Sequence, residues 1–147
     1  NRNGTLKKSN LSNKINLKDM IIVTSKNHRN QTLNNLIKKV KFKDVIVMGS
    51  IGCKISSILR GESDIYISLS LPGESSPKDW DFAAPAAILK AAGGAITNLN
   101  NEELTYGNSN FEQGGIIIAS SNYLFHEKIC LEIKEVIRKY NLYPLSF

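Results

Sequence analysis

Short apolar runs alternate along the chain with segments whose apolar residues recur at helical spacing. Runs typical of strands occupy residues 20–24, 45–48, 64–69, 95–97 and 114–119. Apolar positions three and four residues apart predict helices over 30–40, 51–59, 79–92 and 123–140. This alternation predicts an α/β fold class: a three-layer lobe with a mixed central sheet flanked by helices.

Two predicted helices carry specific expectations. Pro85 lacks a backbone N–H, so we expect it in or near the first turn of a helix that starts at 79–82. The residues of the last helix predicted to face the core are Leu124, Ile129, Ile133, Val136 and Ile137.

Length and composition indicate one folded unit. The chain has 147 residues, 41% of them hydrophobic, and no apolar run approaches the ~18 residues of a membrane span. Residues 1–18 are polar and predict a loop or loose hairpin, whereas 19–147 carry the α/β pattern. Cys53 and Cys130 lack zinc-ligand spacing and are expected to be free, buried thiols in a reducing cytoplasm.

Charge is concentrated at the beginning of the chain. Residues 1–47 hold eleven basic and two acidic residues, whereas the remainder holds eight basic and eleven acidic. Such asymmetry indicates an anionic partner: a nucleotide, a phosphate ester or a nucleic acid. The alternative is a lysine-rich, solvated surface without a specific partner.

Gly49 and Ser50 separate a predicted strand from a predicted helix, with Lys54 one helical turn further on. A hydroxyl and free N–H groups at a helix N-terminus suit a phosphate, and Lys54 adds a positive charge on the same face. The alternative is that Ser50 only caps the helix and Lys54 is an exposed, solvated side chain.

Two other polar clusters are candidates for chemistry. Asp79 and Asp81 precede an alanine-rich helix, where a carboxylate can ligate Mg²⁺ or simply stabilise the helix start. The polar run from Thr24 to Asn30, which includes Ser25 and His28, leaves a strand at its carboxyl end, where open α/β sheets bind ligands. A solvated loop is the alternative for this run.

Together these motifs are more specific than any one of them. The segment WDFAAPAAILKAAGG (80–94) resembles the signature of the inositol monophosphatase superfamily, as do GSIGCK (49–54), GESDIY (61–66) and GGIIIAS (114–120). SKNH (25–28) and Lys54 are similar to the 3'(2'),5'-bisphosphate nucleotidase branch, the CysQ type. The resemblance covers about residues 20–125.

The resemblance implies a Mg²⁺-dependent, lithium-sensitive phosphatase of sulfur metabolism, located in the cytoplasm. Its reaction would convert 3'-phosphoadenosine 5'-phosphate to AMP and phosphate. Asp81 would ligate the second Mg²⁺. The non-scissile phosphate would be held at Gly49, Ser50 and Lys54, while Ser25 and His28 would lie at the adenosine.

The chain also departs from the family pattern. The family's other metal ligands come from a Glu-Glu element and a DPxDGT motif that lie upstream of the segments matched here, and neither occurs upstream of them in this chain. We therefore interpret residues 19–147 as a C-terminal lobe whose N-terminal lobe is absent, and we expect the isolated chain to be inactive. Lys26 stands where the nucleotidases commonly have Arg, and the loop 71–78 is longer than in many relatives.

Other functions remain open at this stage. An inositol monophosphatase or sugar bisphosphatase of the same superfamily is the first alternative. A non-catalytic nucleic-acid-binding lobe is the second, disfavoured because the basic segment lacks interleaved aromatic residues. Apolar surface left bare by a missing lobe could drive formation of a homodimer. No membrane partner is expected.

Overall fold

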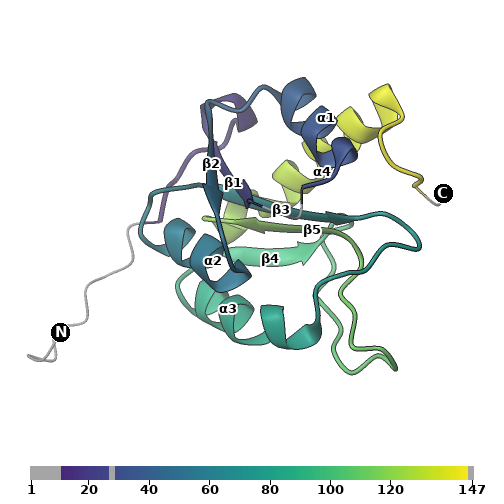
Figure 1. Cartoon of the computed structure of the whole chain (residues 1–147). Coiled ribbons are helices and arrows are strands. Elements are labelled where there is room, and N and C mark those ends of the chain that lie inside the picture. Colours follow the sequence, from purple (N-terminus) through teal and green to yellow (C-terminus); the bar gives the residue numbers. More distant parts are fainter. Residues whose placement is uncertain (1–10, 27–28, 146–147) are drawn as a thin grey trace, which may run out of the picture.

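The computed structural model describes residues 11–26 and 29–145, which form one sheet with helices on both faces (Figure 1). The strands are β1 (Ile21–Ser25), β2 (Asp44–Met48), β3 (Ile65–Ser70), β4 (Ala95–Asn98) and β5 (Gly115–Ser120). The helices are η1 (Leu17–Asp19, a 3-10 turn), α1 (Gln31–Val40), α2 (Ile51–Leu59), α3 (Asp79–Ala91) and α4 (Tyr123–Tyr140). The expected three-layer α/β architecture is confirmed.

The sheet is mixed, with strand order β2-β1-β3-β5-β4. β1 is parallel to β2 and to β3, whereas β5 is antiparallel to both β3 and β4. The carboxyl ends of β1, β2 and β3 therefore meet at one edge of the sheet, with Ser25 opposite Met48. This edge, where the chain leaves three strands in turn, is the natural place for a ligand.

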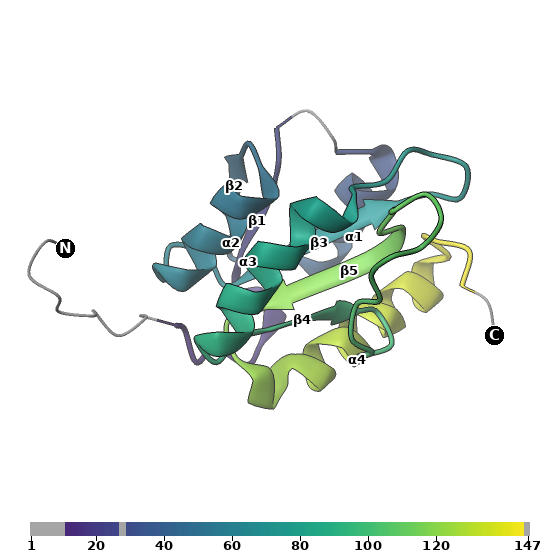
Figure 2. The ribbon, with the colours of Figure 1, turned by 90° about the horizontal axis from the view of Figure 1, so that it is seen from below.

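Each face of the sheet packs on its own apolar core. α1 and α4 cover one face and α2 and α3 the other, the latter two side by side across the strands (Figure 2). Ile65 and Ile67 of β3 belong to the α1/α4 core, whereas Tyr66 belongs to the α2/α3 core. Since successive strand residues point to opposite faces, Ser68 and Ser70 share the α2/α3 side with Tyr66.

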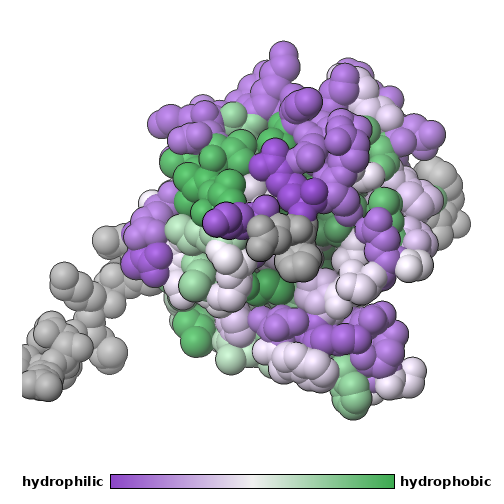
Figure 3. Space-filling model, in the orientation of Figure 1, coloured by the Kyte–Doolittle hydropathy of each residue, from purple (hydrophilic) through white to green (hydrophobic). Residues whose placement is uncertain are grey.

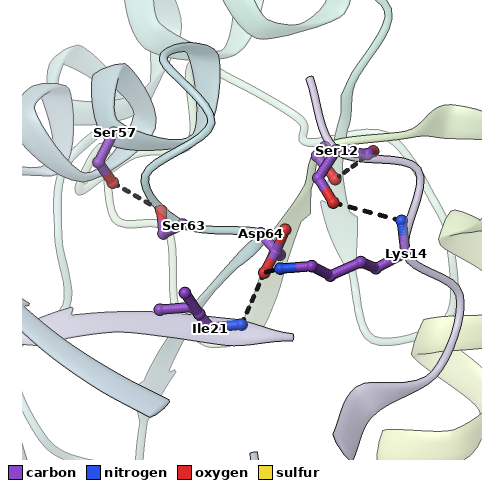
Figure 4. Close-up of polar contacts among 7 residues, drawn as sticks. Ser12, Lys14, Ile21, Ser57, Ser63 and Asp64 are labelled. Carbon is purple, nitrogen blue, oxygen red and sulfur yellow. Dashed lines mark hydrogen bonds and ion pairs between the residues drawn. The ribbon is translucent and has the colours of Figure 1, made fainter. Parts of the chain in front are cut away.

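At the opposite edge, the segment before β1 is bound to the sheet. Asp64 is buried, and its Oδ2 accepts hydrogen bonds from Lys14 Nζ at 2.9 Å and from the backbone N–H of Ile21 at 2.7 Å (Figure 4). Ser121 Oγ donates to the carbonyl oxygen of Ser12 at 2.9 Å. These contacts join residues 12–14 to the amino ends of β1 and β3.

Two sequence expectations about the helices can be compared with the structure. The expected start of α3 at 79–82 is confirmed at Asp79, and Pro85 lies in its second turn, just beyond the first. Proline has no backbone N–H, so the helical hydrogen bond from position 85 to the carbonyl oxygen of Asp81 is missing. Asp81 is an exposed residue, so water can take the place of this donor. In α4, Leu124 is 68% exposed because the buried stripe runs through His126, Ile129, Ile133 and Ile137, on another side of the helix.

The cysteines are both free, but only Cys130 is buried. Cys53 is exposed because it lies in the first turn of α2, outside the set of residues that this helix buries, which are Lys54, Ile55, Ser57 and Ile58. Among the described residues, no helix is long and apolar enough to cross a membrane.

Candidate functional site

A cavity of about 620 Å³ opens at the carboxyl edge of the three parallel strands. It lies between the ends of β1, β2 and β3 and the first turns of α1, α2 and α3. The sequence-predicted site residues that line it are Ser25, Gly49, Ser50, Lys54 and Asp81. His28 lies outside the described residues. Folding thus brings together residues that are up to 56 positions apart in the sequence.

The start of α2 forms one wall of the cavity. Ser50 is the N-cap, and its Oγ accepts a hydrogen bond from the backbone N–H of Cys53 at 3.2 Å. The first-turn N–H groups of Ile51 and Gly52 have no acceptor within the helix and carry its positive dipole end. A Cβ at Gly49 would meet no atom within 4 Å, so glycine here leaves room beside the helix start rather than permitting a strained turn. This wall can accept an anion.

Lys54 lines the cavity, as Arg29 does, and its side chain is buried rather than solvated. Its Nζ donates to the Gly49 carbonyl oxygen at 2.5 Å and lies 5.3 Å from the centroid of the Tyr66 ring. Burial lowers the pKa of this ammonium. Among the described residues, no carboxylate forms an ion pair with it. The alternative of an exposed, solvated lysine is therefore wrong.

Three cavity residues on β3 escaped the sequence analysis: Tyr66, Ser68 and Ser70. All three are buried, and burial raises the pKa of the Tyr66 phenol to about 12. The negative charge of Asp81 acts in the same direction. The sequence does contain a signal for these residues, because polar side chains alternate along the strand with Ile65, Ile67 and Leu69, which point to the other face of the sheet. Such hydroxyls offer a ligand neutral hydrogen bonds.

Asp81 lies at the start of α3 and combines two roles. Its Oδ2 accepts from the backbone N–H of Lys78 at 2.8 Å, which stabilises the helix start. No described residue donates to its other carboxylate oxygen, and the side chain lines the cavity. Asp81 therefore has one oxygen available to a ligand.

Asp79 is a structural residue instead. It is buried, and its two carboxylate oxygens accept from Gln113 Nε2 at 2.6 Å and from the backbone N–H of Gly107 at 2.7 Å. These bonds hold the long connection between β4 and β5 against α3. The two aspartates of this helical turn thus have different roles: Asp79 stabilises the fold, and Asp81 has an oxygen available to a ligand.

Asn30, from the predicted polar run, forms a further part of the wall together with Glu74, which the sequence analysis did not single out. Asn30 caps α1 by accepting from the Leu33 N–H at 2.9 Å, and its Nδ2 donates to the Leu69 carbonyl oxygen at 3.1 Å. Glu74 Oε2 lies 3.5 Å from the same Nδ2 and accepts from the Leu71 N–H at 3.3 Å. The Asn-x-x-Leu spacing signals the cap, but nothing in the sequence places Glu74 beside it.

The positive charge of the first 47 residues is mostly directed elsewhere. Of its basic residues within the described part of the chain, only Arg29 lines the cavity. Lys38, Lys39, Lys41 and Lys43 are exposed near the far end of α1. Figure 3 shows a mainly hydrophilic surface around α1, with apolar residues gathered near the edge strand β2. Within the described part of the chain, most of this positive charge therefore lies away from the cavity.

The described residues offer only part of a metal site. They contain no group of three or more His, Cys, Asp or Glu side chains that could hold a metal ion. Two carboxylates line the cavity, Asp81 and Glu74, and the latter is engaged by Leu71 and Asn30. Oxygen ligands suit Mg²⁺, so Asp81 fits as one ligand, and this chain alone does not complete the set.

Comparison with known proteins agrees with this geometry. The sequence matches the Inositol monophosphatase family over residues 2–138. Over 108 residues it is 32% identical to 3'(2'),5'-bisphosphate nucleotidase 1 of Mus musculus, an alignment that covers 72% of this chain and 34% of that protein. It is 31% identical to the Golgi-resident adenosine 3',5'-bisphosphate 3'-phosphatase of Mus musculus, covering 65% of this chain and 28% of that protein.

A solved structure shows the same fold. The Thermotoga maritima IMPase superposes with a TM-score of 0.65 at 20% sequence identity, covering 90% of this chain and 47% of that chain. The present chain therefore spans about a third of the length of the first of these curated relatives and about half of the solved structure.

Proposed function

Because this chain belongs to the inositol monophosphatase family, we propose that its cavity binds a phosphorylated adenosine nucleotide for dephosphorylation. The reaction is the hydrolysis of 3'-phosphoadenosine 5'-phosphate to AMP and phosphate. The names of the two mouse relatives, a bisphosphate nucleotidase and an adenosine 3',5'-bisphosphate 3'-phosphatase, support this substrate class. The chain supplies the part of such an enzyme that holds the nucleotide.

One observation carries the proposal: Lys54 is a buried ammonium that lines the cavity and has no anionic partner in residues 11–26 and 29–145. An ammonium has three donors, and within these residues one of them is used, on the Gly49 carbonyl. Burying an unpaired charge costs several kcal/mol of folding free energy. An anion bound next to the charge would offset a cost of about this size. A phosphate at the start of α2 would complete the hydrogen bonds of Lys54.

The remaining site residues contact different parts of the nucleotide. Ser50 and the free N–H groups after Gly49 hold the non-scissile phosphate together with Lys54. Ser25, at the carboxyl end of β1, lies on the side where the adenosine binds. We assign His28 to the same end from the sequence motif alone.

Asp81 is the residue that would hold Mg²⁺. When bound, the metal supplies Lewis-acid stabilisation of charge on the transferred phosphoryl group. Within this chain, the Lys78 N–H fixes one oxygen of Asp81, so the carboxylate is held in one orientation with its other oxygen available. The remaining ligands come from carboxylates of a separate lobe, as the resemblance to the family implies.

The proposal predicts that the 147-residue chain releases no phosphate by itself. The measurement is a malachite-green assay of adenosine 3',5'-bisphosphate with Mg²⁺. Phosphate release above a no-protein control would show that the single carboxylate suffices, and the assignment of a divided site would fail.

The binding function is tested by isothermal titration of the chain with adenosine 3',5'-bisphosphate, adenosine and inositol 1-phosphate. We expect the bisphosphate to bind and adenosine to bind much more weakly. Lys54→Met should weaken bisphosphate binding about 100-fold, the loss of a charge-assisted contact in a buried site. Lys90→Met is the matched control, since Lys90 is exposed and pairs with Glu103.

Tighter binding of inositol 1-phosphate than of the bisphosphate would favour an inositol phosphatase, the alternative within the family. Equal binding of both ligands by wild type and Lys54→Met would contradict the proposed site. We further propose the cytoplasm as the compartment of this protein, supported by its two unpaired cysteines.

A further inference from the structure

Charged groups lie at both ends of the cavity. Lys54 lies over the ring of Tyr66, whereas Glu74 lies beside Asn30, which binds the carbonyl oxygen of Leu69. Tyr66 and Leu69 are three residues apart on β3, or about 10 Å along the strand. The cavity therefore has a cationic end inside the α2/α3 layer, and an end next to the start of α1 where the carboxylate of Glu74 and the cation Arg29 both line it.

Glu74 is an exposed residue of the loop 71–78 whose carboxylate is not neutralised by an ion pair. Its Oε2 accepts from the Leu71 N–H at 3.3 Å and lies 3.5 Å from Asn30 Nδ2. None of the described lysines or arginines forms an ion pair with it. The other oxygen, Oε1, has no donor among the described residues, and the side chain lines the cavity. A carboxylate with a free oxygen at this position is an acceptor for a ligand that brings a hydrogen-bond donor.

We propose that Glu74 is a specificity-determining residue that accepts a hydrogen bond from a hydroxyl or amino group of the substrate, at the end opposite the phosphate held by Lys54. This inference rests on the proposed nucleotide-binding function. A carboxylate accepts from neutral donors and repels a phosphate. Glu74 thereby sets the direction in which a nucleotide enters: phosphate toward α2, and the donor groups of its ribose or base toward α1.

Glu74 also excludes a class of competing ligands. Inorganic pyrophosphate carries the same kind of charge as a nucleotide but has no sugar hydroxyl or base amino group to donate to Glu74. It is attracted by Lys54 and Arg29 and repelled by Glu74. A nucleoside bisphosphate gains at both ends, so the pair of charges selects the nucleotide over the simple anion.

The test compares wild type, Glu74→Gln and Glu103→Gln by titration with adenosine 3',5'-bisphosphate and with pyrophosphate. Glu103→Gln removes the same charge from an exposed site outside the cavity, where Glu103 pairs with Lys90. We expect Glu74→Gln to weaken nucleotide binding about tenfold, the loss of one charge-assisted hydrogen bond. Pyrophosphate should bind Glu74→Gln as well as wild type or better, and Glu103→Gln should change neither affinity.

The outcomes separate the two proposals. If wild type does not bind the bisphosphate, the proposed function fails, and the role of Glu74 fails with it. If wild type binds it but Glu74→Gln weakens both ligands equally, Glu74 only holds the loop 71–78, and the specificity role is overturned. An unchanged ratio of the two affinities in Glu74→Gln would overturn it as well. Thermal unfolding of each variant verifies that the fold is retained.

Discussion

The ammonium of Lys54 lies 5.3 Å from the centroid of the Tyr66 ring, and both side chains are buried. Burial lowers the pKa of Lys54 and raises the pKa of Tyr66 to about 12. The phenol therefore stays neutral at physiological pH and does not supply the negative charge that the ammonium lacks. The cavity keeps its positive charge for a ligand.

Removing this charge should not destabilise the protein. In Lys54→Met the buried unpaired ammonium disappears, so we expect the free energy of unfolding to be unchanged or higher by about 1 kcal/mol. Urea unfolding measures it, with Lys90→Met as the exposed control. A loss of more than about 2 kcal/mol would show that Lys54 is needed for the fold and would weaken its assignment to a ligand.

Anion binding should depend on the protonation of Lys54. Only the protonated amine attracts an anion, so affinity is highest below the lowered pKa of Lys54 and decreases as the pH rises through it. Sulfate is a suitable probe because its own charge is constant from about pH 6 to pH 10. Titrations across this range should show the decrease for wild type and a flat profile for Lys54→Met. A flat wild-type profile would contradict this prediction.

Asp79 and Asp81 should respond differently to the same substitution. Asp79→Asn weakens the bonds to Gln113 and Gly107 and should lower the free energy of unfolding by about 1–3 kcal/mol. Asp81→Asn should cost less stability but should abolish Mn²⁺-induced broadening of NMR signals at the start of α3. Equal broadening in wild type and Asp81→Asn would remove Asp81 as a metal ligand.

His126 should make the fold sensitive to acid. It is buried between Ser120 Oγ, 2.7 Å from Nδ1, and Thr97 Oγ1, 2.8 Å from Nε2, and burial lowers its pKa to about 4. Between the unfolded value of 6.5 and about 4, the unfolded chain binds a proton that the folded chain does not. Stability contributed by neutral His126 is therefore complete above pH 6.5 and decreases by about 3 kcal/mol as the pH falls to 4.

Urea unfolding at several pH values measures this dependence, with His126→Gln as the comparison. The variant should be less stable at neutral pH but should lack this part of the acid dependence. An identical slope in both proteins would show that other groups cause it.

The ion pair that binds residues 12–14 to the sheet should contribute to stability. Lys14→Met leaves the buried carboxylate of Asp64 with only the Ile21 N–H, and we expect a loss of about 2 kcal/mol. Lys128→Met is the control, because Lys128 and Glu132 form an exposed pair within α4 worth about 0.5 kcal/mol. Equal losses in the two variants would show that burial of Asp64 adds nothing to its ion pair.

The architecture was predictable because its signals are local. A β-branched run such as Ile21–Val23 forms a strand, and Gly93, with a φ of 99°, follows the end of α3. The errors lay where local patterns leave the direction of a side chain open. Leu124 fits an apolar stripe, but the rotation of α4 about its axis leaves Leu124 exposed and buries His126 instead.

The sequence by itself determined the elements, the family motifs and the residues that meet at the carboxyl edge, because strand direction and helix starts follow from neighbouring residues. Only the tertiary structure decided the electrostatics of the site. Burial of Lys54 against Tyr66, the separate tasks of Asp79 and Asp81, and the placement of Glu74 beside Asn30 all depend on contacts between distant segments. The charge available to a ligand depends on burial and on which carboxylates lie nearby, and neither is encoded in local spacing.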